Sequence, residues 1–464
     1  MSDQPVTKSR TDLQGKAFRR LLRRGARNKI TKLLARIRPQ DVAVMLRGFT
    51  PAEQISLFKI LISDYPQASS DVLVSLDVPT RLAILEQLTP DRIAHLLELA
   101  AVDDAVYLLD SLPRELREQV LAIVDLEERF SDVQAHLAYG DGTAGRIMDT
   151  EYIALEESST VTEAIARFRQ VAQDVDMVSY LYVVDKTGRL LGVTPLRSLL
   201  LAEPTQTLGE IMNSSVIRVH SDTDQEEVAQ LASRYDLLAI PVTDEENRLI
   251  GIVTIDDIVD VFREEATEDF FKMAGTSDDE LTYQERPFKV AGIRLPWILV
   301  NLLGLLFAGM VTTQFQETFT LGLLVGFVPV IMGMAGNVGS QTATIAVRNI
   351  ATGRLGFDRV AILRFLMQQL QVGALLAVSC SALAALAAYA LGSGQLKLAA
   401  VIGISLFVSV QIASLNGVLI PVVFKRLGFD PAVASGPLVT TTNDIIGISI
   451  YFGLATLLFH VFPG

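Results

Sequence analysis

The sequence predicts a multi-domain protein: a cytosolic all-α helical, solenoid-like domain and a tandem α+β repeat, followed by a polytopic α-helical membrane domain of five spans. Three observations predict this fold. Short amphipathic helices restart at prolines between about residues 38 and 138, a duplicated segment follows them, and long apolar runs dominate from residue 295 to the end. At 464 residues the chain is too long for one hydrophobic core, so several domains are expected.

The helical domain follows from a recurring helix start, seen in "RPQDVAVML", "TPAEQISLF", "VPTRLAIL", "TPDRIAHLL" and "LPRELREQV". Each segment places Pro at the first helical position and apolar residues at helical spacing behind it. Proline suits this position because its missing N–H would have no intrahelical partner, and Thr50 and Thr89 suit the N-cap before it. These repeats predict a helical N domain over residues 38–140, and no catalytic constellation is visible in it.

A basic N-terminal arm precedes this domain over residues 1–37. Residues 1–50 carry 13 Lys and Arg against 3 Asp and Glu. The arm could contact anionic lipid or an acidic neighbour, or it could be a solvated helix end or a disordered arm.

The rest of the soluble half is acidic. Residues 51–294 carry 46 Asp and Glu against 20 Lys and Arg. Such a region repels nucleic acid and attracts cations, so no nucleic-acid partner is expected. Plain solubility is the alternative explanation of the charge.

A duplicated segment follows the helical domain. "LYVVDKTGRLLGVTPLRSLL" matches "IPVTDEENRLIGIVTIDDIVDV", and upstream "GRIMDTEYIALEESSTVTEAI" matches "GEIMNSSVIRVHSDTDQEEVA". Three aligned pairs lie at one constant interval: Asp185 and Asp244, Arg189 and Arg248, and Gly192 and Gly251. Each copy reads as helix, strand–turn–strand, helix, which predicts two α+β domains over residues 141–205 and 206–262.

An acidic helix continues from the second copy, in "TIDDIVDVFREEATEDFFKMAG". Four carboxylates share one helical face at i, i+3, i+7 and i+11: Asp257, Asp260, Glu264 and Glu268. Like charges at this spacing destabilise a helix unless a positive charge lies between them. Hard divalent cations bind oxygen ligands and would supply that charge, whereas the alternative is an acidic face exposed to solvent. An upstream cluster could come close on folding: Asp222, Asp224, Glu226, Glu227 and Asp236.

Five apolar spans are expected at about 295–315, 319–345, 361–391, 398–424 and 433–460. Each is long enough to cross a bilayer core of ~30 Å, which needs about 20 helical residues. The loops after the second and fourth spans are basic, whereas the first loop and the C-terminal tail carry no Lys or Arg. Because basic loops face the cytoplasm, we expect a cell-membrane protein with its N-terminal half inside and its C-terminus outside.

Asp444 lies about half-way along the last span, in "LVTTTNDIIGISIYFGLATLLF". The other acidic residues of the membrane half fall in loops: Glu317, Asp358 and Asp430. A carboxylate at the centre of a membrane helix costs about 2.5–3.5 kcal/mol on insertion scales, and no Lys or Arg lies within a span core to pair with it. The pattern therefore predicts a passing cation as its partner. The alternative is a protonated carboxyl group bonded to a neighbouring side chain: Thr440, Thr441 or Asn443.

The second span contains "VPVIMGMAGNVGSQTATIAVRN". Its Pro329, Gly333, Gly336 and Gly339 either break the helical ladder or let helices approach closely. The fourth span, "ASLNGVLIPVVFKRLG", is also polar and is expected to be broken at its proline. Freed carbonyls at membrane depth are tolerated beside a water-filled cavity, so these segments are candidates to line a pathway, with helix packing as the alternative.

The duplicated segment resembles a tandem pair of cystathionine-β-synthase (CBS) domains. Together with "GNVGSQ", "ASLNGVLIP", "FDPAVASGPLVTTTNDIIGISIYF" and the acidic "EEATED" helix, it resembles the MgtE family of magnesium channels and transporters from about Arg38 onward. The resemblance implies a homodimer in the membrane lipid that imports Mg²⁺ through a pore at the dimer axis and is gated closed by intracellular Mg²⁺. CBS pairs are regulatory modules that often bind adenosine nucleotides, so ATP at the pair is a further expectation, with a purely structural spacer as the alternative.

The resemblance also implies roles for individual residues. The pore would hold a hydrated ion at Asp444, beside Asn337, Gly336 and Pro437. A plug helix of about Glu264 to Gly275 would lie in the connecting segment 263–290, before the pore domain over 291–464. Regulatory metal ligands would be Asp224, Glu226, Asp236, Asp257, Asp260, Glu265, Glu268 and Asp269, with Asp71 and Asp103 as counterparts in the helical domain. Gly436 stands where some members carry Asn, so the outer pore lining is expected to differ there.

Two other functions stay open: a proton-coupled divalent cation carrier that uses Asp444 as a proton relay, and a pore regulated mainly by adenine nucleotide at the CBS pair. An enzyme is not expected, because the four histidines form no visible Cys/His dyad or metal-ligating cluster, and no phosphate loop appears. Other divalent cations, such as Mn²⁺, Co²⁺ and Ni²⁺, are candidate cargo beside Mg²⁺.

Overall fold

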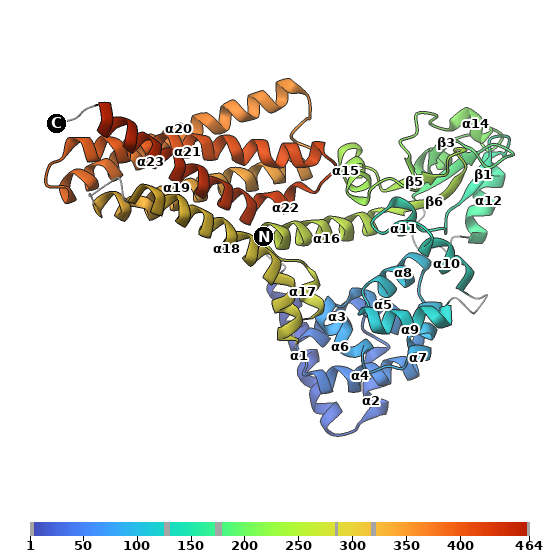
Figure 1. The fold of residues 1–464 in the computed structure, drawn as a ribbon. Helices are drawn as coiled ribbons and strands as arrows, with labels where there is room; N and C mark the ends of the chain where they lie inside the picture. Colours follow the sequence, from blue (N-terminus) through green and yellow to red (C-terminus); the bar gives the residue numbers. More distant parts are fainter. Residues whose placement is uncertain (1–3, 125–129, 172–178, 284–285, 317–321, 462–464) are drawn as a thin grey trace. The chain divides into compact units, whose positions relative to one another are not determined.

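The structure is a computed structural model that describes residues 4–124, 130–171, 179–283, 286–316 and 322–461. The chain divides into two compact units, Met1–Arg263 and Glu264–Gly464. The first unit holds a helical domain and a tandem α/β repeat, and the second holds the long apolar helices (Figure 1).

Short helices form the helical domain: α1 (Gln4–Arg23), α2 (Arg27–Leu34), α3 (Pro39–Arg47), α4 (Pro51–Asp64), α5 (Pro66–Ser75), α6 (Val78–Leu85), α7 (Pro90–Glu98), α8 (Val102–Asp110), α9 (Arg114–Val124) and α10 (Ser131–Leu137). Three of the five predicted helix starts are confirmed, because proline opens α3, α4 and α7. The other two are displaced by one residue, because α6 begins at Val78, before Pro79, and α9 begins at Arg114, after Pro113. Thr50 caps α4 in a reciprocal pair with Glu53, whose backbone N–H donates to Thr50 Oγ1 at 3.4 Å. Thr89 precedes α7 without a capping side-chain bond.

Residues 14–37 belong to this domain rather than to a separate arm. Phe18 of α1 and Ile30 of α2 are each 1% exposed, and both join the core that contains Leu46 and Leu57. Arg19 also lies over the Phe49 ring, 5.0 Å from its centroid. The apolar residues between the basic ones therefore anchor α1 and α2 to the domain, and the domain begins before the predicted boundary at residue 38.

Both copies contain the predicted helix, strand–turn–strand and helix, and in each copy a short helix and a further strand precede them. The first copy contains α11 (Ala144–Ile147), β1 (Ala154–Glu156), α12 (Val161–Val171), β2 (Tyr180–Val184), β3 (Leu190–Pro195) and α13 (Leu196–Leu201). The second contains α14 (Leu208–Ile211), β4 (Val219–His220), α15 (Gln225–Tyr235), β5 (Ala239–Thr243), β6 (Leu249–Thr254) and α16 (Ile255–Met273). Each sheet pairs its first strand parallel to the second and its second antiparallel to the third.

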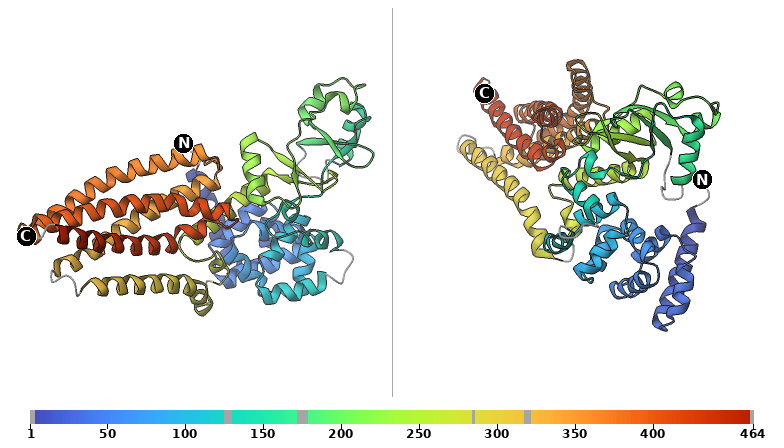
Figure 2. Two further views of the ribbon diagram at one scale, coloured as in Figure 1. Left: turned by 45° about the horizontal axis from the view of Figure 1, so that its top comes forward. Right: turned by 90° about the vertical axis from the view of Figure 1, so that its right-hand side faces the viewer.

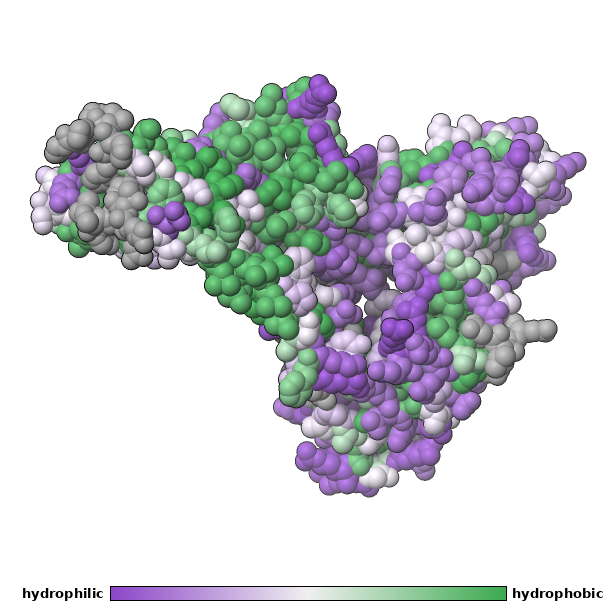
Figure 3. Space-filling model, in the orientation of Figure 1, coloured by the Kyte–Doolittle hydropathy of each residue, from purple (hydrophilic) through white to green (hydrophobic). Residues whose placement is uncertain are grey.

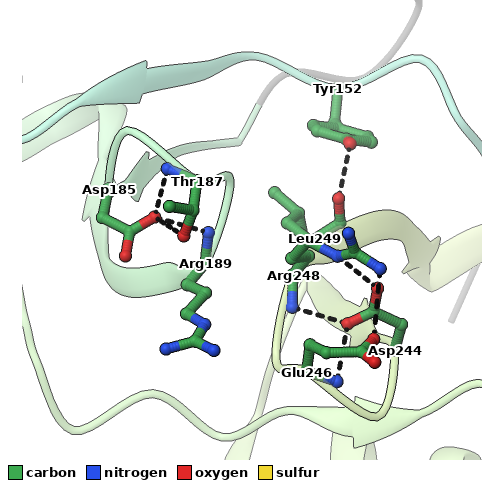
Figure 4. Close-up of polar contacts among 8 residues, drawn as sticks. All are labelled: Tyr152, Asp185, Thr187, Arg189, Asp244, Glu246, Arg248 and Leu249. Atoms are coloured by element: carbon green, nitrogen blue, oxygen red, sulfur yellow. Dashed lines mark hydrogen bonds and ion pairs between the residues drawn. The ribbon is translucent and has the colours of Figure 1, made fainter.

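The duplicated Asp–Arg pairs build the two hairpin turns (Figure 4). Asp185 Oδ1 accepts from the backbone N–H of Thr187 at 2.7 Å and of Arg189 at 2.9 Å. Asp244 accepts in the same way from Arg248 at 2.8 Å. These side-chain bonds hold each turn closed, which gives a structural role to the aspartates at equal positions.

The two turns also pair with each other. The Leu190 N–H donates to the Asn247 carbonyl at 3.0 Å, and the Leu249 N–H donates to the Gly188 carbonyl at 3.0 Å. The two repeats therefore meet turn to turn.

The first turn of each copy packs in the core of the other copy. Ala144 and Met148 lie in the cluster around Val219 and Val253, whereas Leu208 lies in the cluster around Leu181. A Cβ at Gly192 would collide with Met212, and a Cβ at Gly251 would collide with Met148, so the duplicated glycines make room for this exchange. The hydrophobic cores thus do not follow the predicted boundaries 141–205 and 206–262.

The second unit contains α17 (Asp279–Thr282), α18 (Pro287–Gln316), α19 (Gly322–Ala351), α20 (Arg359–Leu391), α21 (Leu396–Arg426), α22 (Pro431–Ser435) and α23 (Pro437–Val461). Within the described ranges, five helices are long and apolar enough to cross a membrane: Pro287–Phe315, Leu323–Ala351, Arg359–Leu391, Leu396–Arg426 and Pro437–Leu458. They run side by side (Figure 2), and apolar residues cover much of their visible surface (Figure 3). The five predicted spans are confirmed. The predicted first loop falls largely at residues 317–321, outside the described residues.

The helix break predicted at the proline of the fourth span is wrong, and of the two alternatives for the second span the structure shows close helix approach. α19 runs uninterrupted past Pro329, and α21 runs uninterrupted past Pro421. The small residues instead let helices approach, because a Cβ at Gly417 of α21 would lie 2.7 Å from the Gly339 carbonyl oxygen of α19. The interruption comes at Gly436, between α22 and α23, so the last long helix begins at Pro437 rather than at residue 433.

Candidate functional site

A hollow of about 380 Å³ lies between α19 and α23 in the second unit. It is lined by Pro329, Met332, Gly333, Gly336, Asn337, Ser340, Thr440 and Asp444. The residues from α19 recur at helical spacing and therefore share one face, and Thr440 and Asp444 lie one turn apart on α23. Glycines on this face leave the space that larger side chains would fill.

Asp444 is 8% exposed and lines this hollow. Its carboxylate makes no hydrogen bond or ion pair with any residue that the structure describes. The three neighbours named as alternative partners bond elsewhere: Thr440 to Ser340 at 3.0 Å, Thr441 to Asn301 at 3.1 Å, and Asn443 to Asn416 at 3.0 Å. The Asp444 carboxylate can therefore contact a water molecule or a cation inside the hollow.

Gly336 and Asn337, which were predicted to lie beside Asp444, line the same hollow as Asp444. A Cβ at Gly336 would come within 3.4 Å of Asp444 Oδ1, so the glycine keeps the approach to the carboxylate open. Asn337 is exposed and contributes an amide to the lining.

Pro437 is not among the residues that line the hollow. It opens α23 and lies against Gly275, where a Cβ would be 2.8 Å from Pro437 Cγ. A Cβ at Gly436 would collide with the carbonyl oxygen of Met273, the last residue of α16. Gly436 therefore packs against the end of the predicted plug helix.

Lys272 ties the end of α16 to the loop between α21 and α22. Its Nζ lies 2.5 Å from Asp430 Oδ2 and also pairs with Glu268. Burial disfavours the ammonium charge, but the two carboxylates outweigh that cost and raise the pKa of Lys272. Glu268, a predicted metal ligand, is thus paired with an ammonium group in this structure, and the sequence analysis did not single out the Lys272–Asp430 pair.

A cluster of carboxylates joins the helical domain to the second repeat within the first unit. Asp103 and Asp104 lie in the first turn of α8, and Asp257 lies in the first turn of α16. Burial, reinforced by Asp104 and Asp149, raises the pKa of Asp103 to about 7. Burial, reinforced by Asp257, likewise raises the pKa of Asp104 to about 7. Several negative charges therefore repel one another in a partly desolvated place.

Within this cluster, Asp257 has the most strongly raised pKa. Burial and the Asp103 charge raise its pKa to about 8, although the Thr254 hydroxyl donates to Asp257 Oδ2 at 2.5 Å. Asp103 Oδ1 is buried and has no hydrogen-bond partner among the described residues. An unsatisfied buried carboxylate oxygen beside a second carboxylate is a place where a cation would be stabilised.

The structure thus brings the predicted residues Asp103 and Asp257 together. The sequence analysis missed Asp104, Asp149 and Asp256, and the acidic doublets at 103–104 and 256–257 are the signal that could have revealed two of them. Across the described ranges, no group of three or more His, Cys, Asp or Glu side chains is arranged to hold a metal ion directly.

The other predicted ligands are spread along the fold. Asp224 caps the start of α15 and Asp236 follows its end, so about 18 Å along the helix separates them. Asp71 lies on α5, close enough to contribute to the raised pKa of Asp104. Glu226 accepts from Gln230, and Asp260 pairs with Arg263 at 3.2 Å. Glu265 and Asp269 lie on the part of α16 that belongs to the second unit.

We expect the cluster to make stability depend on pH in the absence of divalent cations. Because the folded-state pKa values of Asp103, Asp104 and Asp257 are raised, the folded protein binds more protons than the unfolded chain. The free energy of unfolding should therefore fall as pH rises from about 4, the ordinary carboxyl range, to about 8, the folded-state pKa of Asp257. The midpoint of thermal unfolding of the soluble domains in the full chain, measured in a chelator, checks this. Mg²⁺ should flatten the dependence, and Asp257→Asn should weaken it, whereas a midpoint that rises over this range would contradict the assignment.

Three parts of the chain match family models. Residues 37–142 match the MgtE intracellular N domain, residues 144–204 and 208–264 match the CBS domain, and residues 328–454 match the MgtE divalent cation transporter domain. A magnesium transporter MgtE from Bacillus subtilis is 32% identical over 95% of this chain and 96% of its own length. This chain belongs to the MgtE family of magnesium transporters.

Two further MgtE proteins are similar to this chain. The magnesium transporter MgtE of Thermus thermophilus is 40% identical over 71% of this chain and 72% of its own length. The solved cytosolic domain of the Mg²⁺ channel MgtE in complex with ATP is 34% identical, with 53% of this chain and 99% of that chain covered and a TM-score of 0.49. As an MgtE-family member, the chain is a multi-pass membrane protein with a cytosolic N-terminal domain. The full-length relatives are transporters and not enzymes, which confirms the prediction that this chain is not an enzyme.

Proposed function

We propose that this MgtE-family chain is a homodimeric channel that imports Mg²⁺ and is closed by intracellular Mg²⁺. The observation that carries the proposal is Asp444: a carboxylate at membrane depth that lines an open hollow and has no partner among the described residues. Such a group is expensive inside a membrane protein unless a cation or water meets it.

The chemistry of the hollow suits a hydrated Mg²⁺ ion. Mg²⁺ sheds its water reluctantly and often binds through one or two carboxylates. Its six waters need roughly 180 Å³ at about 30 Å³ each, and the hollow has about 380 Å³. The amide of Asn337 and the hydroxyls of Ser340 and Thr440 can hydrogen-bond those waters.

The same hollow supports a homodimer. It is lined from two helices, α19 and α23, and is partly open. A second copy placed by a two-fold axis would close the open side and bring two Asp444 carboxylates to one divalent charge. Basic loops face the cytoplasm. The basic loops after α19 and α21 therefore support an orientation with these loops on the cytoplasmic side of the membrane and the C-terminus on the other side.

The acidic cluster and α16 support gating by internal Mg²⁺. Without a cation, the carboxylates of α8 and α16 repel one another, and bound Mg²⁺ would offset that repulsion in the closed state. α16 runs as one helix from Ile255 to Met273, and its end contacts the start of α23. The helix that carries Asp257 therefore continues into the second unit, where its end meets the start of α23.

ATP at the CBS pair also belongs to this proposal. A small cleft of about 10 Å³ is lined by tyrosines of the first repeat, among them Tyr152, Tyr180 and Tyr182. The Tyr182 hydroxyl is buried without a partner among the described residues and can bond a ligand there. The Tyr152 hydroxyl donates to the Leu249 carbonyl at 3.0 Å (Figure 4). Because the cleft is smaller than a nucleotide, binding would require Tyr152 to leave this bond.

Current recordings from the purified protein in planar bilayers test the function. We expect unitary Mg²⁺ currents that do not depend on a proton gradient and whose open probability falls when Mg²⁺ is raised on the cytosolic side. The competing proton-coupled carrier predicts flux without unitary currents, driven or blocked by the pH difference across the membrane. That result would replace the channel by the carrier.

A further inference from the structure

The outer face of α1 and α2 is strongly basic. Residues 14–38 contain ten Lys and Arg and no Asp or Glu. Three of these side chains are paired within the domain, Arg19 and Arg23 with Glu53 and Arg27 with Asp64. The other seven are exposed and make no ion pair with any residue that the structure describes. These seven form the basic face: Lys16, Arg20, Arg24, Lys29, Lys32, Arg36 and Arg38.

The folding of α1 and α2 presents these charges outward. Lys16, Arg20 and Arg24 recur at every fourth residue, so they line up along α1 and just past its end. Phe18, Ile30 and Leu34 point the other way and are at most 5% exposed. Figure 3 shows a hydrophilic surface over the end of the domain that carries α2. The apolar side chains thus hold the basic face on a rigid support.

We propose that the basic face docks onto the anionic headgroups of the bilayer that the chain itself spans. The membrane helices tether the face to that bilayer, so docking is intramolecular and occurs at a high effective concentration. Clusters of Lys and Arg beside a membrane are attracted by anionic lipid over about one Debye length.

The observations favour a bilayer over nucleic acid. The one aromatic residue in 14–38, Phe18, is 1% exposed and offers no base-stacking surface. Residues 51–294 carry 46 acidic and 20 basic residues, so a long polyanion that extends beyond the basic face would be repelled. A planar bilayer meets only the face that is turned toward it.

Limited trypsin cleavage of the full chain in nanodiscs tests the proposal, because trypsin cuts after exposed Lys and Arg. Cleavage after Arg20 and Arg24 is compared with cleavage after the exposed Arg167 and Arg169 of α12, which serve as an internal reference. We expect the ratio to fall at least tenfold when roughly a third of the lipid is anionic rather than all zwitterionic. The protection should disappear at about 1 M salt, where the Debye length is about 3 Å.

A charge variant separates docking from other causes. Each Lys or Arg near an anionic surface strengthens binding about fivefold, so Lys29→Gln, Lys32→Gln and Arg36→Gln together should weaken docking on the order of 100-fold and remove the protection at Arg20 and Arg24. The matched control, Arg197→Gln, Arg218→Gln and Arg234→Gln, should keep it. Cleavage after Arg20 and Arg24 that is equally fast in anionic and zwitterionic lipid, without protection in either, overturns the proposal. Protection that is equally strong in zwitterionic lipid also overturns it, because an acidic protein surface would then be the partner.

Discussion

Asp444→Asn should reduce Mg²⁺ transport by more than tenfold while leaving the protein folded in the membrane. The substitution keeps the size of the side chain and removes the negative charge that lines the hollow. At an effective dielectric constant of about 20, a unit charge pair separated by about 4 Å interacts by about 4 kcal/mol, and about 1.4 kcal/mol already corresponds to a tenfold effect. Uptake of Mg²⁺ by cells that lack their own magnesium importers measures the effect.

A second carboxylate of the membrane half provides the control. Asp358 caps α20 by accepting from the Ala361 N–H at 3.0 Å, and it does not line the hollow. Asp358→Asn keeps the capping oxygen, so transport should stay near the wild-type level. Wild-type uptake by Asp444→Asn, with equal amounts of protein in the membrane, would reject a role for this carboxylate in permeation.

Neutralising the predicted sensor should leave the pore conducting at high internal Mg²⁺. The variant combines Asp257→Asn, Asp260→Asn, Glu265→Gln and Glu268→Gln. A ligand shifts a conformational equilibrium only by the difference in its affinity for the two states, so the loss of these carboxylates should remove the inhibition. Currents recorded from membrane patches while Mg²⁺ is raised on the cytosolic side give the inhibition curve, and we expect the half-inhibiting concentration to rise at least tenfold.

Four exposed carboxylates outside this cluster form a control with the same change in charge: Asp91→Asn, Glu157→Gln, Glu203→Gln and Glu245→Gln. This control should keep the wild-type curve. Wild-type inhibition of the sensor variant would reject the sensor assignment. A sensor variant that is shut at every Mg²⁺ concentration would show that repulsion among the carboxylates, rather than bridging by bound ions, sets the gate.

The structure also indicates which carboxylates of the predicted sensor should contribute most to inhibition by Mg²⁺. Asp257 lies in the half-buried cluster with Asp103, whereas Glu268 is already paired with Lys272. Asp103→Asn combined with Asp257→Asn should therefore account for more of the lost inhibition than Glu268→Gln. Sequence spacing could not make this distinction, because it placed Asp257 and Glu268 on one face of one helix without showing what either of them meets.

Local features of this protein could be predicted from the sequence alone. Proline at the first position of α3, α4 and α7, the paired Asp185 and Asp244 turns, and the five apolar spans all follow from the backbone preferences and burial of a few neighbouring residues. Asp444 was identifiable for the same reason, because a single charge within an apolar span stands out without any knowledge of the fold.

Only the tertiary structure decided which distant groups meet. Asp103 and Asp257 converge through packing between the helical domain and the second repeat, and Lys272 finds Asp430 across the second unit. The exchange of α11 and α14 between the repeats, and the burial of Phe18 beneath the basic face, also arise from non-local contacts. Such contacts depend on how whole helices and strands pack against one another. They cannot be predicted from the spacing of residues along one helix or strand.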